Sequence, residues 1–302
     1  MRTERYERLR ELRAHQPEAI AAAAARRRRR PLLGGSGRLM LVAADHPARG
    51  ALGVRGRPGA MADRYDLLDR LRTALARPGV DGVLATPDIL EDLLLLDCLD
   101  DKVVIGSMNR GGLHGAVFEL DDRFTAYDAA TIAGMGLDGG KMLCRIDLAD
   151  PDTAATLQSC GRAIGELARH RLMAMIEPFL SGRVDGRLRN DLTVEGVVRS
   201  VAIAQGLAPT SAYTWLKLPV VDGMEQVMAA TTLPTLLLGG DPSAAPEETY
   251  AAWGKALALP GVRGLVVGRA LLYPPDDDVA AAVDTAVSLV HDATTPHERP
   301  GH

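Results

Sequence analysis

The sequence predicts an α/β protein, a (β/α)8 TIM barrel with an N-terminal helical extension. From Arg38 onward, eight short apolar runs alternate with amphipathic stretches, which is typical of βαβ units around a parallel sheet. The chain has 302 residues, 47% hydrophobic and 25% charged, and a barrel of this kind needs about 250. The first run ends Ala44-Asp45-His46-Pro47, which is not the glycine-rich fingerprint of an open dinucleotide-binding sheet.

The predicted elements follow from hydrophobic periodicity. The strands are expected at Leu39–Ala44, Gly82–Thr86, Val103–Ser107, Lys141–Ile146, Leu172–Glu177, Thr214–Leu218, Thr235–Gly239 and Leu265–Gly268. Amphipathic stretches between them predict helices, for example at Tyr65–Leu75, Thr125–Met135, Thr153–Ala168, Val194–Gln205, Glu247–Leu257 and Val279–Val290. No internal repeat or low-complexity linker interrupts Arg38–Val290. We therefore expect one barrel domain at residues 38–293, preceded by a helix and arginine-rich linker at 1–37 and followed by a disordered tail at 294–302.

The N-terminal segment is rich in Arg, Glu and Ala, and Arg2–Ala25 is predicted to be a single helix. It continues into five consecutive arginines, Arg26–Arg30, and stops at Pro31. Such a run can bind nucleic acid or an anionic surface. We favour a solvated helix end, where cations are stabilised by the helix C-terminus, because the remainder of the chain is acidic and offers no supporting basic motif.

Composition excludes several classes of protein. A net charge of −4 and a pI near 6.0 argue against a nucleic-acid-binding body. No apolar stretch reaches the roughly 18–20 residues of a membrane span, and the N-terminus lacks the apolar core of a secretory signal. The three cysteines, Cys98, Cys144 and Cys160, show neither C-x-x-C pairing nor metal-like spacing with histidine. The sequence thus predicts a cytoplasmic protein.

Active sites of TIM barrels lie at the C-terminal ends of the strands. Side chains alternate along a strand, so Lys217 shares a face with Trp215. If such faces point inward, Lys141, Glu177 and Lys217 converge in a space of low dielectric. Burying their charges there costs free energy unless opposite charges pair with one another. The polar and glycine candidates at strand ends are Asp45, His46, Asn109, Arg110, Lys141, Arg145, Glu177, Lys217, Gly239, Gly240, Gly268 and Arg269.

Lys217 is the strongest candidate nucleophile. It lies in an apolar strand, Thr214–Leu218, with no adjacent carboxylate in sequence. Burial and a nearby cation both favour the neutral form of an amine, and a neutral amine can attack a carbonyl to form an iminium. The alternative is a lysine whose stem packs in the barrel while its ammonium pairs with Glu177 or Asp45.

Three further residues have both a catalytic and a structural interpretation. Lys141 would keep the Lys217 amine neutral or bind the substrate, or simply pair with Glu177 or Asp147. Glu177 would transfer protons or only orient a lysine. Asp45 would accept the hydroxyl proton released when a carbon–carbon bond breaks, or cap the following loop.

A phosphate-binding site is predicted at the last two strands. Gly239 and Gly240 follow one strand, and Gly268 and Arg269 follow the next. Glycine lets backbone N–H groups approach an anion closely, and barrels often bind phosphate at these two loops. Arg269 would add an ionic contact, although the glycines alone also fit tight turns.

Two other residues are candidates for contacting the substrate. Arg145 lies on the same strand face as Lys141, and His46 lies at an accessible strand end. Neither belongs to a sequence motif that defines its role.

Together these residues resemble the class I aldolase superfamily of deoxyribose-phosphate, tagatose-bisphosphate and archaeal-type fructose-bisphosphate aldolases. The resemblance spans nearly all of residues 38–290, in separate motifs. It is carried by Leu41–His46, Gly140–Leu143, Met175–Pro178, Trp215–Pro219 and the glycine loops. It implies a Schiff base on Lys217, no cofactor and no metal, and a phosphorylated sugar as substrate. Tagatose-bisphosphate aldolases are most similar, because they share the strand-four lysine and strand-five glutamate.

The resemblance has one clear departure. Deoxyribose-phosphate aldolases carry a second lysine on strand seven, and Pro234–Gly240 has none. The chain also resembles actinobacterial aldolase-like proteins associated with inositol catabolism. That likeness implies 2-deoxy-5-keto-gluconate 6-phosphate, cleaved to dihydroxyacetone phosphate and malonate semialdehyde.

Three alternatives remain open. A metal-dependent aldolase would need clustered histidine and carboxylate ligands, but the seven histidines are scattered. A sugar-phosphate isomerase or epimerase would use the same fold. A non-catalytic sugar-phosphate-binding barrel would bind without turnover. Barrels of this type often self-associate, so the sequence also leaves a homo-oligomer open.

Overall fold

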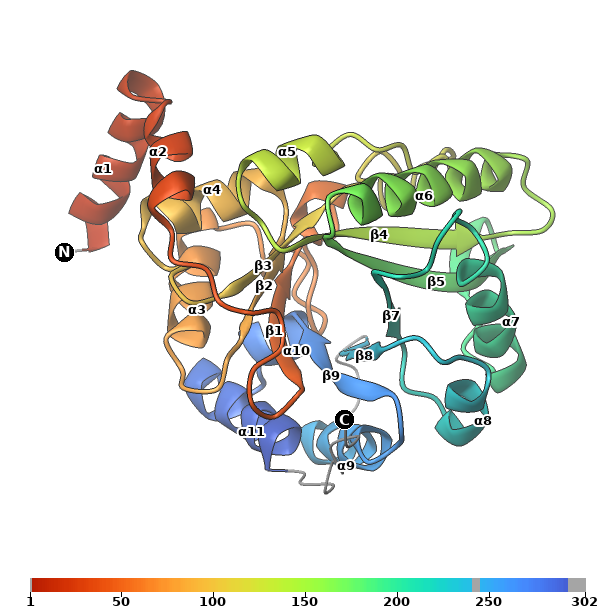
Figure 1. The fold of residues 1–302 in the computed structure, drawn as a ribbon. Helices are drawn as coiled ribbons and strands as arrows, with labels where there is room; N and C mark the ends of the chain where they lie inside the picture. Colours follow the sequence, from red (N-terminus) through yellow and green to blue (C-terminus); the bar gives the residue numbers. More distant parts are fainter. Residues whose placement is uncertain (1, 241–244, 293–302) are drawn as a thin grey trace, which may run out of the picture.

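The computed structural model describes residues 2–240 and 245–292, and it confirms the TIM barrel (Figure 1). Within these residues, eight parallel strands form a closed ring. They are β1 (Leu39–Ala44), β2 (Gly82–Ala85), β3 (Val103–Ser107), β4 (Gly139–Ile146), β5 (Met173–Val184), β7 (Thr214–Leu218), β8 (Thr235–Leu238) and β9 (Val262–Val267). Neighbours pair in the order β4-β3-β2-β1-β9-β8-β7-β5, and β4 pairs with β5 to close the ring. The predicted tail, 294–302, lies outside the described residues.

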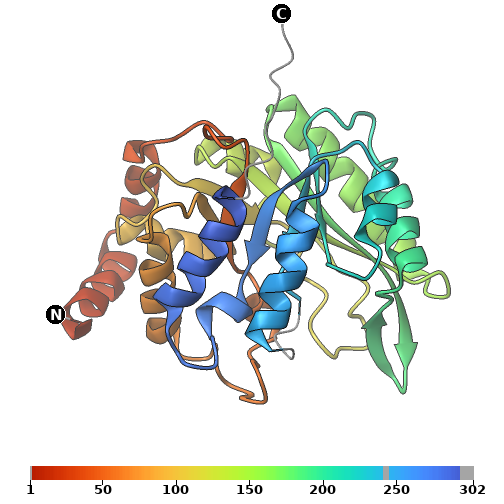
Figure 2. The ribbon, with the colours of Figure 1, turned by 90° about the horizontal axis from the view of Figure 1, so that it is seen from below.

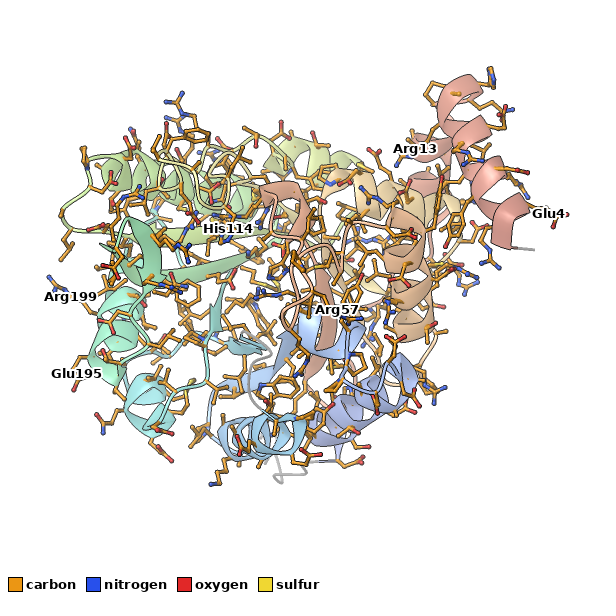
Figure 3. The ribbon with its side chains drawn as sticks, turned by 180° about the vertical axis from the view of Figure 1, so that it is seen from behind. Glu4, Arg13, Arg57, His114, Glu195 and Arg199 are labelled. Atoms are coloured by element: carbon orange, nitrogen blue, oxygen red, sulfur yellow. The ribbon has the colours of Figure 1, made fainter. Side chains whose placement is uncertain are left out.

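Helices surround this ring on its outer side (Figure 1). They are α3 (Arg64–Leu75), α4 (Pro87–Leu95), α5 (Ala129–Gly134), α6 (Asp152–Arg169), α7 (Val194–Ala204), α8 (Met224–Ala229), α9 (Pro246–Leu257), α10 (Arg269–Leu272) and α11 (Val279–His291). Their amphipathic pattern explains this placement. On α7, Glu195 and Arg199 point away from the barrel (Figure 3), whereas Val197 and Val201 are buried against it.

Most predicted boundaries agree with the structure within a few residues. The exception among the helices is Thr125–Met135, which is wrong at its start because α5 begins only at Ala129. The Asp128 side chain accepts a hydrogen bond from the Thr131 N–H and caps the helix there. Among the strands, β9 begins at Val262, three residues before the predicted start at Leu265.

The sequence prediction missed a β-hairpin that extends the barrel beside the strand ends. β5 continues to Val184 and pairs antiparallel with β6 (Arg187–Asn190). Asp185 and Gly186 form the turn with φ of 50° and 73°, as a two-residue type I′ turn requires. Figure 2 shows this hairpin projecting from the body of the barrel. The Asp-Gly pair in the sequence is the signal that would have identified it.

Alternation along the strands divides the apolar core into two parts. Leu39, Leu41 and Ala43 belong to a cluster inside the barrel, whereas Met40 and Val42 pack between the strands and the helices. The inner cluster is completed by Leu84, Val103, Ile105, Met173, Met175, Trp215, Leu236 and Val266. Because Trp215 is in the inner cluster, Lys217, two residues further on, also faces inward.

The N-terminal helix is not continuous, so the single predicted helix Arg2–Ala25 is wrong. The chain forms α1 (Arg2–His15) and α2 (Ala19–Arg26), separated at Pro17. Proline lacks the N–H of an interior helical position and clashes with the preceding turn. Both helices pack on the outside of the barrel, where Tyr6 donates a hydrogen bond to Asp69 (2.7 Å) and Arg13 to Asp92 (2.7 Å). Figure 3 labels Arg13 on this outer helix.

The arginine run Arg26–Arg30 is also not the solvated helix end that we expected. The helix ends at Arg26, and the guanidinium of Arg27 is buried, with 7% of the residue exposed. Each arginine of the run pairs with a carboxylate: Arg26 with Asp97, Arg27 and Arg29 with Asp138, Arg28 with Asp100 and Asp101, and Arg30 with Asp81.

These pairs attach the N-terminal segment to the N-terminal ends of the barrel strands. Asp138 precedes β4 and also accepts a hydrogen bond from the Val104 N–H. Asp81 precedes β2 and accepts from the Met40 N–H. The arginine run therefore stabilises the face of the barrel opposite the strand ends where we expect the chemistry.

Candidate active site

A large cavity lies at the C-terminal ends of the strands, where the sequence placed the candidate residues. Its volume is about 1030 Å³, at the upper end of the range for ligand pockets. Its lining includes Asp45, His46, Arg110, Lys141, Arg145, Glu177, Lys217, Gly239, Gly240, Gly268 and Arg269. Asn109 is not among the lining residues; its side chain instead hydrogen-bonds both the N–H and the C=O of Leu143 and joins β3 to β4.

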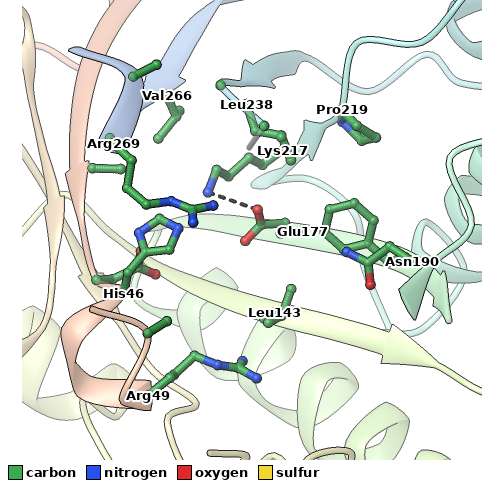
Figure 4. A pocket seen from close by; sticks show the side chains of 18 of the residues that line it. His46, Arg49, Leu143, Glu177, Asn190, Lys217, Pro219, Leu238, Val266 and Arg269 are labelled. Atoms are coloured by element: carbon green, nitrogen blue, oxygen red, sulfur yellow. Dashed lines mark ion pairs between the residues drawn. The ribbon is translucent and has the colours of Figure 1, made fainter. Parts of the chain in front are cut away.

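Lys217 is one end of a buried chain of four ionisable groups. Its Nζ lies 3.0 Å from Glu177 Oε1 (Figure 4). The other carboxylate oxygen, Oε2, lies 2.5 Å from Lys141 Nζ, which lies 3.1 Å from Asp45 Oδ2. Only 4% of Lys217 is exposed, and its three partners are buried as well. The chain links β7, β5, β4 and β1 across the interior of the barrel.

Opposite charges determine the ionisation of the two carboxylates. Burial by itself raises the pKa of Glu177, but the charges of Lys141 and Lys217 outweigh it and hold this pKa at about 2. Burial also raises the pKa of Asp45, and Arg110 followed by Lys141 outweighs it, so this pKa lies well below the usual range. Both carboxylates are therefore ionised at neutral pH.

His46 lies next to this chain and carries no charge at neutral pH. Burial lowers the pKa of its imidazole to about 3, and Arg269 and Lys217 add to the effect, although Asp45 opposes it. Its Nδ1 lies 3.6 Å from Asp45 Oδ1. Figure 4 shows the ring beside the guanidinium of Arg269. A neutral imidazole here can donate or accept a hydrogen bond to a ligand.

Arg110 is a member of this cluster that the sequence placed near a strand end without giving it a role. Its Nη2 donates to Asp45 Oδ2, and its Nε donates to Ser107 Oγ at 2.7 Å. Ser107 Oγ in turn lies 3.4 Å from the same Asp45 oxygen. Asp45 Oδ2 thus contacts Arg110, Lys141 and Ser107 together.

The predicted phosphate loops lie on one side of the cavity. Gly239, Gly240, Gly268 and Arg269 all line it. Gly240 has φ of +67°, and a Cβ on Gly268 would lie 2.3 Å from the carbonyl oxygen of Ala43. Both positions therefore require glycine, for the backbone conformation or for the close approach of two strands. Figure 4 shows the Arg269 guanidinium directed toward the centre of the cavity.

Arg145 also lines the cavity, but most of its donors are used within the protein. Its Nη1 donates to Glu119 Oε1 at 2.5 Å and its Nη2 to the Glu119 carbonyl at 2.7 Å. Arg49 lies 3.7 Å from the same carboxylate and donates to Asp122 at 2.8 Å. Glu119 and Asp122 follow β3 by more than ten residues, which explains why sequence spacing did not reveal this network.

The cavity as a whole is positively charged, although the chain carries a net charge of −4. Among the described residues that line it, seven are Lys or Arg and four are Asp or Glu, an excess of three positive charges. The β5–β6 hairpin contributes to this surface through Arg189, next to Asn190, which Figure 4 shows at the cavity. Such a lining attracts anionic ligands.

The described residues contain neither a metal-binding cluster nor a membrane-spanning helix. No group of three or more His, Cys, Asp and Glu side chains within residues 2–240 and 245–292 is arranged to hold a metal ion. Over the same residues, none of the helices has the length and apolar character needed to cross a bilayer.

Comparison with known families identifies the chain by sequence. The model of the Cgl0159-like family matches residues 37–287. The chain belongs to the Cgl0159-like family. The crystal structure of Cgl0159 from Corynebacterium glutamicum is 56% identical, with a TM-score of 0.94, over 96% of this chain and 98% of that one. No curated protein matches the sequence.

More distant structures show where this family stands among folds. A Schiff-base-forming fructose-1,6-bisphosphate aldolase is 18% identical, with a TM-score of 0.64, over 90% of this chain and 99% of that one. A fructose-bisphosphate aldolase from Slackia heliotrinireducens is 15% identical, with a TM-score of 0.59, over 89% of each chain. At such identities the likeness of this Cgl0159-like protein to the aldolases establishes the barrel fold and nothing further.

Proposed function

We propose that this protein is a class I aldolase that makes or breaks a carbon–carbon bond in a phosphorylated sugar through a Schiff base on Lys217. The observation that carries the proposal is the position of the Lys217 amine. It is buried at the C-terminal end of the barrel, faces a large cavity, and lies 3.0 Å from a carboxylate that also holds a second lysine. A lysine beside another cationic group in a protected pocket is the usual arrangement for an amine nucleophile.

The proposed reaction begins with attack of the neutral Lys217 amine on the substrate carbonyl. The carbinolamine loses water to give an iminium. A base then removes the proton of the hydroxyl group beta to the iminium carbon, the carbon–carbon bond breaks, and its electron pair moves toward the iminium nitrogen to leave an enamine. Protonation of the enamine carbon and hydrolysis release the second product and restore the lysine.

Glu177 is the carboxylate best placed to act as the base in this scheme. It is in direct contact with Lys217, so it can transfer protons to and from groups bound at that nitrogen. Asp45 contacts Lys141 and Arg110 instead. In the proposal, Asp45 therefore holds Lys141 in position, and Lys141 binds Glu177 and the substrate hydroxyls.

The substrate is proposed to carry a phosphate held by Gly239, Gly240, Gly268 and Arg269. The excess of positive charge in the cavity supports an anionic substrate, and so does the activity of the structurally similar fructose-bisphosphate aldolases. Arg145 and His46 are proposed to contact the remainder of the molecule. We propose three classes to screen: 2-deoxy-5-keto-gluconate 6-phosphate, deoxyribose phosphates and ketose bisphosphates.

Trapping of the imine tests the proposal directly. The protein is incubated with dihydroxyacetone phosphate, reduced with borohydride, and digested for peptide mass spectrometry. The expected result is a reduced adduct on Lys217, which the K217A variant lacks while retaining its circular dichroism spectrum. If neither this ketone nor the three substrate classes leaves an adduct, or if K217A retains turnover, the aldolase assignment is wrong, and an isomerase or a binding protein takes its place.

A further inference from the structure

A second group of buried charges lies beside the cavity, formed by Arg49, Arg145, Glu119 and Asp122. Arg49 donates to Asp122 at 2.8 Å and lies 3.7 Å from Glu119. Arg145 donates to Glu119 at 2.5 Å and lies 3.7 Å from Asp122. All four residues are buried. The group contains two charges of each sign, so it is neutral as a whole.

The part of this group that faces the cavity is nevertheless positive. Arg49, Arg145 and Glu119 line the cavity, whereas Asp122 is not among the lining residues. The Asp122 carboxylate also accepts a hydrogen bond from the Gly112 N–H at 2.9 Å. The group therefore presents two positive charges and one negative charge to a ligand in the cavity.

The Arg49 guanidinium has hydrogen-bond donors that the protein does not use. A guanidinium carries five N–H donors, and within the described residues the Arg49 side chain makes one hydrogen bond, to Asp122. Arg145 differs, because it uses both of its Nη atoms on Glu119. Unused donors on a buried guanidinium cost free energy unless water or a ligand accepts from them. Arg49 is thus the member of the group that can bind a ligand.

The surroundings of Arg49 also favour an anionic ligand. Burial lowers the pKa of Arg49 to about 10, and the charge of Arg145 adds to this effect, although Asp122 opposes it. Arg49 is still charged at neutral pH, but the neighbouring carboxylates compensate this charge only in part. A carboxylate or phosphate group of a ligand would complete the compensation, and either can accept two parallel hydrogen bonds from an arginine.

Arg49 lies away from the predicted phosphate loops. It belongs to the short helix Pro47–Arg49 after β1, whereas the loops follow β8 and β9. Figure 4 shows the Arg49 guanidinium on the far side of Leu143 from Lys217 and Arg269. A ligand held at both places would extend across the part of the cavity that Lys217 faces.

We propose that Arg49 is a second anion subsite, which binds a carboxylate or phosphate at the end of the substrate remote from the phosphate loops. This inference rests on the proposed function and narrows its substrate. It retains 2-deoxy-5-keto-gluconate 6-phosphate and ketose bisphosphates, which carry two anionic groups. It excludes deoxyribose phosphates, which carry one. Glu119 and Arg145 hold the subsite in place.

Isothermal titration calorimetry of the full-length protein tests the subsite with three hexose-derived ligands that lack a ketone or aldehyde. Glucitol 6-phosphate carries one anionic group, gluconate 6-phosphate a carboxylate and a phosphate, and mannitol 1,6-bisphosphate two phosphates. At least one two-anion ligand should bind about 10- to 100-fold more tightly than glucitol 6-phosphate, as charge-assisted hydrogen bonds contribute. The tighter of the two identifies the second group. Equal affinity for all three ligands, or no binding of either two-anion ligand, would overturn the proposal.

Variants assign the preference to Arg49. R49Q should lower the affinity for the two-anion ligands to that for glucitol 6-phosphate and leave the latter unchanged. R187Q is the control, because Arg187 is exposed on β6 and is not among the lining residues; it should keep the preference. If circular dichroism shows that R49Q does not fold, R49Q/D122N takes its place, since it leaves no buried Asp122 charge. A preference that persists without Arg49 would overturn the subsite.

The result does not depend on imine formation, because none of the three ligands contains a reactive carbonyl. A two-anion preference without any trapped adduct on Lys217 would contradict the proposed function and leave the Arg49 subsite standing. An adduct trapped in a protein without this preference would contradict the subsite and leave the aldolase assignment standing.

Discussion

Replacement of Arg27 by alanine tests whether the N-terminal arginine run is part of the folded barrel. Arg27 donates to the Lys102 carbonyl at 2.7 Å and to the Gly136 carbonyl at 2.6 Å, and lies 3.4 Å from Asp138. R27A would leave two carbonyls without this donor and a buried carboxylate with fewer partners. Removing one partner of a buried ion pair costs about 3–5 kcal/mol.

The expected loss is at the lower end of that range, about 3 kcal/mol, because Asp138 keeps Arg29 at 2.9 Å and the Val104 N–H at 2.9 Å. Unfolding entropy is about 2.1 cal/mol/K per residue, so for 302 residues this loss lowers Tm by about 5 °C. Differential scanning calorimetry measures the shift.

The matched control is Arg26, the preceding residue of the same run. It pairs with Asp97 in a bridge in which both side chains are more than half exposed, and such surface pairs contribute about 0–1 kcal/mol. R26A should therefore change Tm by no more than about 2 °C. Equal shifts for R26A and R27A would refute the assignment of Arg27 as a buried structural contact.

Two further substitutions test the site. E177Q removes the proposed base and should lower turnover by about 10²–10⁴-fold. Lys217 should still form an imine that borohydride traps. Unchanged turnover would exclude Glu177 from proton transfer. Because the pKa of Glu177 is about 2 in the folded protein, below its ordinary value of 4.5, its charge stabilises the fold above about pH 4.5, and this contribution is lost as pH falls toward 2. Urea midpoints measured against pH should therefore fall less steeply for E177Q than for the wild type. G268A should lower Tm and phosphate affinity, because the added Cβ would lie 2.3 Å from the Ala43 carbonyl oxygen. G35A is the control, since a Cβ added at Gly35 meets nothing within 4 Å. Equal Tm values for the two variants would contradict the close approach at Gly268.

The barrel itself was predictable because its signal is local. Eight apolar runs and the amphipathic stretches between them correspond to observed strands and helices, and the boundary errors are a few residues except at β5, which continues to Val184 in the hairpin. Two predicted helix boundaries were wrong because of a single side chain in each case. Pro17 divides the N-terminal helix into α1 and α2, and Asp128 caps α5 and so determines where it begins. The domain boundaries at residues 37 and 293 stay a prediction.

Part of the candidate site was also predictable, for the same reason. Side-chain alternation places Lys217 and Glu177 on inward faces, and the strand-end rule places the glycine loops and Arg269 at one mouth of the barrel. The contacts of Lys217 and of Lys141 with Glu177 were among the alternatives that the sequence left open, whereas the contact of Lys141 with Asp45 was not. The structure contains these ion pairs, and the proposed chemistry uses them, so the two interpretations do not compete.

The sequence by itself determined the order of strands and helices, the inward direction of the lysines and the position of the glycine loops, because each depends on a repeat of two or about four residues along the chain. Only the tertiary structure decided which charges meet. Arg110 reaches Asp45, Arg145 reaches Glu119, and Arg27 reaches Asp138 across separations of 65, 26 and 111 residues. Such distances are set by the closure of the barrel and the path of its loops, and no periodicity in the sequence encodes them.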